Sequence, residues 1–349
     1  MKKKLLIITQ VVDTNHPILG FFHGWLAEFA TQCESVHVIA LAVGAHTLPS
    51  NVTVHSLGKE SGESRLKYLW RFYRTIYSLR HDYDAVFVHM NQVYVILGGL
   101  LWRLWGKRIG LWYAHGAVST SLRVATMLTH IVFTSTPQGF RIKSPKVVVT
   151  GQGIDMSRFR YVPRTESSML RLLVVGRIAE SKGIKTLLEA CHRLKESGIP
   201  FLFTIVGAST TDTERHYEAT LHEYCKVAGL ESPVVWHGGA AQAELPGLLA
   251  ATDIFIHDGA TNSLDKVLVE AVACGVPVIS SNPSYRYIMG ESEWPIFFPP
   301  RDSAALATKI TDLADRPLFD KNEFTRAAAA KVQQEHSLSN LISGIMSRF

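Results

Sequence analysis

The stretch LLVVGRIAESKG, residues 172–183, is the part of the sequence that indicates the fold most clearly. Its apolar run predicts a strand buried on both faces of a parallel sheet, and the glycines on either side of the polar loop predict a turn into a helix. Arg177 and Lys182 then follow the carboxyl end of that strand. Arg can fork two phosphate oxygens and Lys adds a point charge, so this pair suits a diphosphate. A solvated loop with two surface cations is the alternative.

Similar apolar runs recur along the chain and alternate with longer amphipathic stretches. Such alternation is typical of βαβ units, which build doubly wound parallel sheets. The runs fall into two groups, so we expect an α/β protein with two Rossmann-like domains that face a central cleft. The expected strands are residues 4–9, 36–41, 84–90, 108–113, 130–135 and 146–151 in the first half, and 171–176, 201–207, 234–239, 253–259 and 277–281 in the second.

The length of 349 residues also favours two domains, each with its own core, and one large single domain is the alternative. The polar stretch 161–168, which contains Pro163, is the predicted linker. We expect domains over residues 1–163 and 164–325, followed by a helical segment, 326–349, that packs back on the first domain. Ligands of such sheets gather at the carboxyl ends of the strands, so functional residues are expected in the loops that follow strands.

Basic residues are concentrated in the first half of the chain. Residues 1–160 hold 18 of the 36 Lys and Arg residues but only 8 of the 30 Asp and Glu residues. An excess of positive charge indicates an anionic partner, such as a membrane surface, a phosphorylated substrate or nucleic acid. No RNA- or DNA-binding motif accompanies the charge, which argues against nucleic acid.

Three features predict a cytoplasmic protein. The four cysteines are far apart and match neither a metal-binding spacing nor a disulfide framework. The apolar residues 4–9 are followed by polar residues without a cleavage site, so they predict the first strand rather than a signal peptide. The longest apolar run, Val93–Trp102, is too short to cross a bilayer.

A second motif, TNSLDKVLVEAVACGVPVISS, covers residues 261–281. It predicts a loop, a helix that carries Glu270, and a buried strand. The free amides at the start of that helix would attract an anion. Glu270 has apolar neighbours, which favour a buried carboxylate with partners over a solvated helix face. Such a carboxylate could accept hydrogen bonds from ribose hydroxyls, as carboxylates do in dinucleotide-binding folds.

The loop after the first strand, HPILGFFHGW (16–25), contains Gly20, where backbone amides could approach a ligand closely. The loop lacks the three-glycine dinucleotide fingerprint, and no strand is followed by a Walker loop. Hydride transfer to NAD and P-loop chemistry therefore lose support. An ordinary strand-to-helix turn is an equally good interpretation of Gly20.

In their order along the chain, these motifs resemble those of family 4 glycosyltransferases, which are retaining, metal-independent enzymes of the GT-B fold. The resemblance implies a GT-B protein with His115 beside the donor sugar. The matching segments are the Gly-Arg to Lys-Gly loop (176–183), an aspartate-bearing strand (245–259), the Glu-Ala-x-Ala-x-Gly-x-Pro-Val segment (270–278), a hinge-like segment (147–159) and LWYAHGAVS (111–119).

The resemblance also implies a role for each matching residue of the second half. Arg177 and Lys182 would hold the donor diphosphate and stabilise it as it leaves. Glu270 would bind the ribose, and the backbone amides of Ser263 and Leu264 would bind the distal phosphate. No metal site is expected, because the family is metal-independent and no carboxylate pair indicates one. No cofactor is expected either, because the nucleotide-diphosphate sugar is a co-substrate.

Two residues depart from the family pattern. Asn262 stands where the family has a glutamate that touches the transferred sugar, so we expect Asn262 to contact the donor with an altered preference among sugars. Asp265 stands at a glycine position, where it could cap the helix or oppose a phosphate with its charge.

Residues 64–80, SRLKYLWRFYRTIYSLR, combine basic and aromatic residues in a helical pattern. A basic amphipathic helix with aromatic residues of this kind fits an anionic membrane surface. A helix that covers the sheet with its aromatic side chains packed inward is the alternative. Both interpretations hold if only the basic edge of this helix contacts lipid.

Together with the resemblance, these features predict a hexosyltransferase-type glycosyltransferase, and the resemblance implies that the configuration is retained. The enzyme would move a sugar from a nucleotide-diphosphate sugar to a saccharide or lipid-linked acceptor in cell-envelope polysaccharide or glycolipid synthesis. The donor would bind mainly to residues 164–325 and the acceptor mainly to residues 1–160, with the protein peripheral on the inner face of the membrane. Two alternatives remain: a catalytically silent GT-B protein that binds a nucleotide sugar or a partner, and a sugar-nucleotide epimerase of the same fold.

Overall fold

The computed structural model describes residues 2–16, 18–259 and 263–349. These residues form two compact units, each built on one parallel sheet. Unit 1 takes the chain up to Asp155 together with His336–Phe349, and unit 2 is Met156–Glu335. The sequence predicts boundaries after residues 163 and 325, and the observed crossings lie eight residues earlier and ten residues later.

The first crossing precedes the predicted linker because the segment before Pro163 pairs with unit 2. The N–H of Val162 donates to the carbonyl of Cys274 over 3.2 Å. The hydroxyl of Tyr161 donates to the carbonyl of Asn322 over 3.1 Å. These hydrogen bonds make the segment part of unit 2 rather than a free linker.

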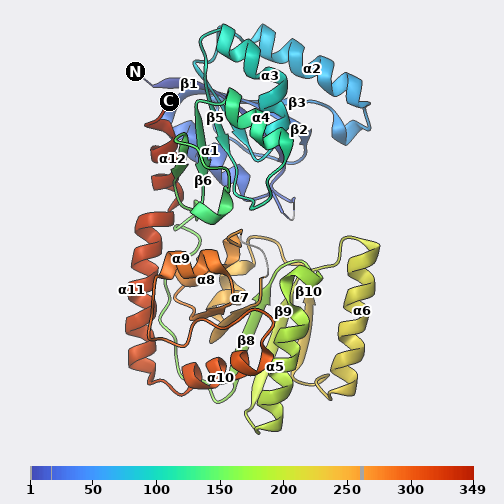
Figure 1. Cartoon of the computed structure of the whole chain (residues 1–349), viewed down its shortest axis with the longest axis vertical. Helices are drawn as coiled ribbons and strands as arrows, with labels where there is room; N and C mark the ends of the chain where they lie inside the picture. The colour runs from blue at the N-terminus through green and yellow to red at the C-terminus, as the bar shows by residue number, and fades with distance from the viewer. Residues whose placement is uncertain (1, 17, 260–262) are drawn as a thin grey trace. The chain divides into compact units, whose positions relative to one another are not determined.

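Unit 1 contains a seven-stranded parallel sheet in the order β3-β2-β1-β4-β5-β6-β7 (Figure 1). The predicted runs of the first half coincide with six of these strands, and β3 is an additional strand that the sequence did not indicate. Its side chains at the sheet edge are mostly half-buried, so it lacks the continuous apolar run of a central strand. The strands are β1 (Lys3–Val12), β2 (Cys33–Val43), β3 (Val52–Ser56), β4 (Ala85–His89), β5 (Arg108–Trp112), β6 (Ile131–Thr134) and β7 (Val147–Val149).

Helices cover both faces of this sheet (Figure 1). The division follows from the alternation of side chains along each strand. On β1, Leu5 and Ile7 join the core under α1 and α12, whereas Leu6 and Ile8 join the core under α2, α3 and α4. The helices are α1 (Phe22–Gln32), α2 (Arg65–Ser78), α3 (Gln92–Leu104), α4 (Thr120–Leu128) and α12 (Leu338–Met346), with the short 3-10 helices η1 (Lys59–Ser61) and η2 (Pro137–Gly139).

The helix α12 lies in unit 1 although it is the last helix of the chain. The N–H of Ile154 donates to the carbonyl of His336 over 2.7 Å, and the N–H of Leu338 donates back to Ile154 over 2.8 Å. Leu341 and Ile345 of α12 are buried in the same core as α1. Most of α11 (Leu318–His336) belongs to unit 2 instead.

Unit 2 contains a five-stranded parallel sheet in the order β10-β9-β8-β11-β12. Each strand coincides with a predicted run. The strands are β8 (Leu170–Val175), β9 (Phe201–Val206), β10 (Val234–Gly238), β11 (Ile254–His257) and β12 (Val278–Ser280). The other elements are η3 (Glu180–Lys182), α5 (Ile184–Glu196), α6 (Asp212–Val227), α7 (Leu245–Ala250), α8 (Lys266–Ala273), α9 (Pro283–Met289) and α10 (Ser303–Ala314).

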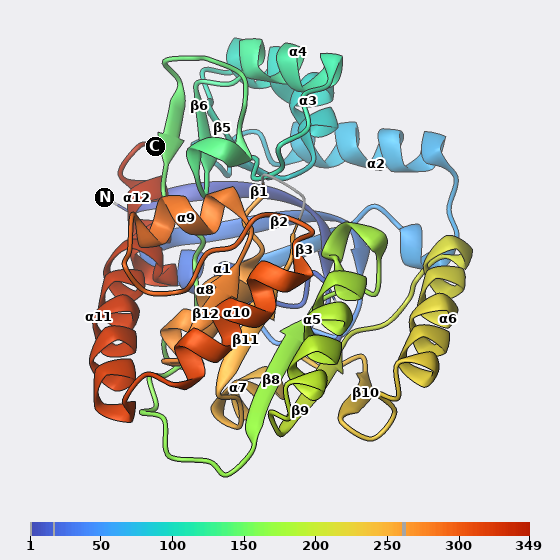
Figure 2. The same cartoon turned by 60° about the horizontal axis from the view of Figure 1, so that its bottom comes forward.

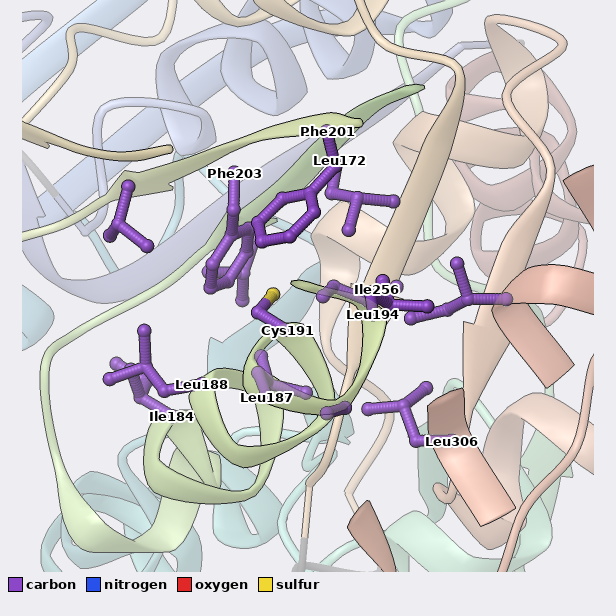
Figure 3. Close-up of a cluster of buried hydrophobic side chains, with 14 of the residues drawn as sticks. Leu172, Ile184, Leu187, Leu188, Cys191, Leu194, Phe201, Phe203, Ile256 and Leu306 are labelled. Atoms are coloured by element: carbon purple, nitrogen blue, oxygen red, sulfur yellow. The ribbon is translucent and has the colours of Figure 1, made fainter. Parts of the chain in front are cut away.

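The helices α5 and α10 pack on one face of the unit 2 sheet (Figure 2). In this core, Leu187 and Cys191 of α5 lie near Phe203 of β9 and Leu306 of α10 (Figure 3). All four cysteines of the chain are buried free thiols. Burial raises the pKa of Cys225 to about 11, so this thiol is protonated at neutral pH.

The strand orders place one reversal in each sheet. In unit 1 the strands that follow β1 are added on one side of it, and those that follow its neighbour β4 are added on the other side. In unit 2 the neighbours β8 and β11 divide the sheet in the same way. The carboxyl ends of strands at such a reversal form the usual ligand crevice of an open α/β sheet. In unit 2 the loops at this point carry most of the residues that the sequence singled out.

Candidate functional site

The loop after β8 turns sharply through η3 into α5. Gly183 ends η3 with a φ of 60°, a left-handed conformation that favours glycine. A Cβ at this position would lie 2.6 Å from the carbonyl oxygen of Asp258, on the neighbouring loop. Glycine therefore lets the β8 loop and the β11 loop approach each other closely at the crevice.

The two predicted cations of the β8 loop both meet carboxylates. The Nζ of Lys182 lies 2.6 Å from Oδ2 of Asp265 in a mostly buried pair. Arg177 is more exposed, and its Nη1 lies 2.9 Å from Oε1 of Glu214 on α6. Hydrogen bonds from Thr210, together with the charge of Arg177, lower the pKa of Glu214, so this carboxylate is ionised at neutral pH. The loop thus brings two cations to the end of β8, each anchored by a charge partner.

Asp265 takes the N-cap position of α8, as the sequence allowed, but it does not cap the helix. Among the described residues, its carboxylate makes no capping hydrogen bond. Its Oδ2 instead accepts from Lys182 and lies 2.7 Å from Nε2 of His257, the last residue of β11. Burial disfavours the charged form of Asp265, but the hydrogen bond and charge of His257 and the charge of Lys182 outweigh burial and lower its pKa. Asp265 is therefore an anion at neutral pH.

His257 is held in place on both sides. Its side chain is almost fully buried, and its Nδ1 lies 3.0 Å from Oγ of Ser280 on the neighbouring strand β12. The same Ser280 Oγ accepts from the N–H of Asn282 over 3.1 Å. The imidazole is thus fixed by a chain of polar groups that ends at Lys182.

A second ion pair braces the same two loops. Asp258 is fully buried and lies 3.2 Å from Nη1 of Arg301. The other guanidinium nitrogen of Arg301 donates to the carbonyl of Glu180 in η3 over 2.7 Å. The hydroxyl of Ser281 donates to Asp258 over 2.8 Å. These contacts fix η3, and with it the start of the Lys182 side chain, against β11.

Glu270 is buried in the structure, as its apolar neighbours predict. It lies on α8 with a relative exposure of 2%. Its Oε1 lies 3.2 Å from Nζ of Lys266 and 3.4 Å from Nε2 of Gln242. A buried carboxylate with a charged partner stays available as an acceptor for hydroxyl groups.

The predicted phosphate-binding amides lie at the start of α8. Leu264 is buried, and the carbonyl of Ser263 accepts a hydrogen bond from Nδ2 of Asn282 over 2.9 Å. These contacts hold the backbone just before the helix in place. Asn262, the predicted sugar-contacting residue, lies outside the described residues, so its role stays a prediction.

Gly20 and His115 both lie in unit 1, after β1 and β5 respectively. A Cβ on Gly20 would lie 2.8 Å from the carbonyl oxygen of His16, and the Gly20 N–H donates to that same oxygen over 2.9 Å. The turn itself therefore requires glycine and uses its amide. His115 is exposed, and its Nδ1 accepts from the N–H of Ala117 over 3.2 Å. Its expected place beside the donor sugar stays a prediction.

Sequence reasoning missed the partners that hold the candidate residues in place, namely Glu214, Gln242, His257 and Arg301. His257 closes a predicted strand, at the carboxyl end where ligands gather, and this position was the one available signal. In the described part of the chain, no cluster of three or more His, Cys, Asp or Glu side chains has a metal-binding arrangement.

Comparison with known proteins identifies the class. Residues 159–332, nearly all of unit 2, match the model of the family described as glycosyl transferases group 1 and belong to that family. The two α/β units together form the GT-B fold, so the predicted family and fold class are confirmed.

Two curated relatives are similar over the same region. WcaL of Escherichia coli (strain K12), named as a colanic acid biosynthesis glycosyltransferase, is 28% identical over 200 residues, which cover 54% of this chain and 47% of WcaL. The amylovoran biosynthesis glycosyltransferase AmsK of Erwinia amylovora is 33% identical over 200 residues, with the same coverage of 54% and 47%. The chain thus spans less than half the length of these relatives.

Solved structures resemble the whole chain in fold. The Anabaena protein Alr3699/HepE, crystallised in complex with UDP, has a TM-score of 0.78 at 19% identity, and 99% of each chain is covered. Sucrose-phosphate synthase from Thermosynechococcus elongatus has a TM-score of 0.79 at 16% identity, with coverage of 99% and 98%. These neighbours extend the fold assignment to unit 1, which the family model does not reach.

Proposed function

We propose that this chain is a retaining glycosyltransferase that moves a hexosyl group from a nucleotide-diphosphate sugar to a saccharide or lipid-linked acceptor. The observation that carries the proposal is the grouping at the carboxyl ends of β8 and β11. Arg177, Lys182 and the start of α8 supply positive charge and donors there, and buried Glu270 supplies an acceptor on the same helix. A nucleoside diphosphate needs both kinds of partner: cations and N–H donors for its phosphates, and an acceptor for its ribose hydroxyls.

In the proposed reaction, an acceptor hydroxyl oxygen bonds to the anomeric carbon while the bond from that carbon to the diphosphate breaks. The electron pair of the broken bond stays on the departing diphosphate, and a phosphate oxygen takes up the hydroxyl proton. Lys182 and Arg177 stabilise the negative charge that grows on the leaving group, and the amides of Ser263 and Leu264 add donors. This stabilisation acts mainly in the transition state, so it raises the rate rather than only the affinity.

The comparisons support the donor class and the pathway. HepE was crystallised with UDP and, separately, with UDP-glucose, so a uridine nucleotide sugar is the first donor to test. WcaL and AmsK carry names that assign them to the synthesis of colanic acid and amylovoran, which are polysaccharides. We therefore place the proposed reaction in cell-envelope polysaccharide or glycolipid synthesis, without a metal or cofactor requirement.

The test is a donor screen with three readouts. The protein is incubated with UDP-, GDP- and ADP-sugars, with and without lipid-linked saccharides and EDTA, while nucleotide release, sugar isomerisation and binding are followed. Acceptor-dependent nucleotide release that survives EDTA is the expected result. Binding without reaction would favour a silent protein, and isomerisation without transfer an epimerase.

A matched pair of variants links the screen to the site. Lys182→Ala should abolish most of the nucleotide release. Lys185→Ala removes an exposed lysine one turn further on, at the start of α5, and should leave the rate near that of the wild type. Equal rates in both variants would contradict the assigned site.

We propose further that the protein works in the cytoplasm, docked on the inner face of a membrane through α2 and α3. Within α2 only Phe72 and Ile76 are buried, whereas Trp70 and Tyr77 are more than half exposed. On α3, Leu100 and Leu104 are exposed as well. We call the group Leu66, Trp70, Tyr77, Leu100 and Leu104 the α2–α3 apolar face.

Basic residues surround the α2–α3 apolar face. Residues 64–80 contain five basic and no acidic residues. The guanidinium of Arg74 lies 5.1 Å from the ring centre of Trp70, and that of Arg80 lies 4.2 Å from the ring centre of Tyr77. Apolar and aromatic groups flanked by cations suit the interface of an anionic bilayer. No helix in the described ranges is long and apolar enough to cross a bilayer.

Co-sedimentation with vesicles tests the docking. We expect binding to phosphatidylglycerol-containing vesicles that weakens in high salt, and little binding to phosphatidylcholine alone. The double variant Trp70→Ser/Leu104→Ser should reduce binding several-fold. Phe319→Ser, which changes a residue that is 76% exposed on α11 of unit 2, serves as the control and should bind like the wild type. Equal binding to both vesicle types would contradict an electrostatic contribution.

A further inference from the structure

The inference concerns Asp265 and His257, and it rests on the proposed function. We propose that Asp265, held by His257, is a positioning residue that sets the ammonium of Lys182 for the leaving diphosphate. Both side chains meet at one oxygen: Oδ2 of Asp265 is 2.6 Å from the Lys182 ammonium and 2.7 Å from Nε2 of His257.

The carboxylate of Asp265 has an unusual orientation for its place at the start of α8. An aspartate at an N-cap normally turns its carboxylate to the amides of its own helix. Asp265 turns away from α8 and toward the β8 loop instead, although the position would allow a cap. The side chain of Asp265 therefore binds Lys182 and His257 instead of the amides of its own helix. This orientation indicates that its role lies at the carboxyl ends of β8 and β11.

The chain of polar groups that ends at Lys182 has matching hydrogen-bond donors and acceptors. With a proton on Nε2, His257 donates to Asp265, and its Nδ1 shares a hydrogen bond with the hydroxyl of Ser280. Ser280 Oγ in turn accepts from the N–H of Asn282. Every donor then meets an acceptor, so the imidazole holds the carboxylate in a single orientation.

The contact with Asp265 uses only part of the donor capacity of the Lys182 ammonium. An ammonium group has three N–H donors, and Asp265 takes one of them. Among the residues that the structure describes, no other group takes the remaining two donors, so both can meet phosphate oxygens. A lysine side chain is long and flexible, so an anchor at its end restricts where those two donors point. The hydrogen bond from His257 also draws on the charge of Asp265, which reduces its repulsion of a phosphate.

Positioning predicts a specific split between rate and affinity. Without Asp265 the ammonium of Lys182 is misplaced, and the loss is greatest in the transition state, where negative charge develops on the leaving diphosphate. Asp265→Ala should therefore lower kcat by about ten- to a hundred-fold. The Kd for UDP should change by less than about three-fold, because removing the anion and loosening Lys182 have opposite effects on ground-state binding. Asp212→Ala, which removes a nearly fully exposed carboxylate on α6, is the matched control.

A conservative pair separates positioning from a structural role. His257→Gln can keep a side-chain N–H near the position of Nε2, whereas His257→Ala cannot. We expect His257→Gln to retain several-fold more turnover than His257→Ala, with circular dichroism unchanged in both. Similar losses in both variants would show that only the packing of His257 matters, and would overturn the proposal.

The outcomes distinguish this inference from the proposed function. If the wild type turns over a donor and Asp265→Ala has an unchanged kcat, the inference fails alone. Tighter UDP binding with an unchanged or higher kcat in Asp265→Ala would mean that Asp265 competes with the donor, and this also overturns the inference. If the wild type turns over none of the donors, the proposed function fails and the inference fails with it.

Discussion

Oε1 of Glu270 lies 3.2 Å from Nζ of Lys266, one turn earlier on α8, so the buried carboxylate keeps a cation on its own helix. The pair satisfies the charge of Glu270 without occupying all of its acceptor sites. Glu270 can therefore stay buried and still bind hydroxyl groups.

Glu270→Gln should weaken nucleotide binding through the ribose. Hydrogen bonds to a charged group contribute about 1.5–3 kcal/mol, so the Kd for UDP should rise by about ten- to a hundred-fold. Inorganic pyrophosphate has no ribose, and its Kd should stay unchanged. Calorimetric titration of both ligands measures the difference, with Glu196→Gln at the exposed end of α5 as the control. An equal loss for both ligands would place Glu270 at the diphosphate instead.

Lys182→Ala should weaken the same pyrophosphate probe. The variant removes a charged donor and leaves the buried Asp265 without its cation, so the Kd for pyrophosphate should rise by about ten-fold or more. Asn262→Ala should have a much smaller effect, because an uncharged amide in the predicted sugar contact does not hold the diphosphate. Similar effects of the two substitutions would undercut both assignments.

Asn262→Glu should change which sugar is transferred. The substitution restores the glutamate of the family pattern, and a carboxylate accepts from sugar hydroxyls without offering the donors of an amide. We expect the ratio of kcat/KM between two UDP-hexoses that differ at one hydroxyl to shift by about ten-fold. The measurement is a competition assay with both donors in one mixture. An unshifted ratio would remove Asn262 from the sugar contact.

Gly183→Ala should destabilise the protein more than Gly198→Ala. Both glycines have left-handed backbones, with φ of 60° and 72°. A Cβ on Gly198 would meet nothing within 4 Å, whereas one on Gly183 would meet Asp258 and Arg301. We expect a loss of about 1 kcal/mol in the free energy of unfolding for Gly198→Ala, and clearly more for Gly183→Ala. Urea unfolding measures both free energies of unfolding. Equal losses in the two variants would mean that the β8 and β11 loops move apart easily to accommodate the Cβ.

Arg164→Met should lower the stability of unit 2. The buried guanidinium of Arg164 donates to the carbonyls of Leu249, Thr252 and Cys274. Methionine fills part of the space but takes one hydrogen bond away from each of these buried carbonyls, at a cost of about 3 kcal/mol. Arg193→Met on the exposed side of α5 is the control for losing an arginine. Guanidinium chloride unfolding that gives equal midpoints for the two variants would contradict this account.

The parallel strands could be predicted because they are buried on both faces and therefore leave continuous apolar runs, as in LLVV of β8. The strand β3 could not, because a half-buried edge strand has no such run. The burial of Glu270 followed from its neighbours. The partners of Arg177 and Lys182 did not, because Glu214 and Asp265 are 37 and 83 residues away along the chain, and no local pattern encodes such contacts.

Asp265 illustrates where local rules fail. Its sequence context predicts a helix cap, and the backbone takes the N-cap position as expected. The carboxylate follows the stronger electrostatic attraction of Lys182 and His257 instead. Residues of a functional crevice are where local preference and global arrangement most often disagree.

The return of α12 to unit 1 has a consequence for the order in which the protein is made. Translation proceeds from the N-terminus, so the ribosome completes unit 2 before it synthesises Leu341 and Ile345, which unit 1 needs for its core. Domains that are finished early usually fold early. Unit 1 is therefore begun first but completed last. The surface of α1 that packs against α12 stays uncovered until α12 has been synthesised.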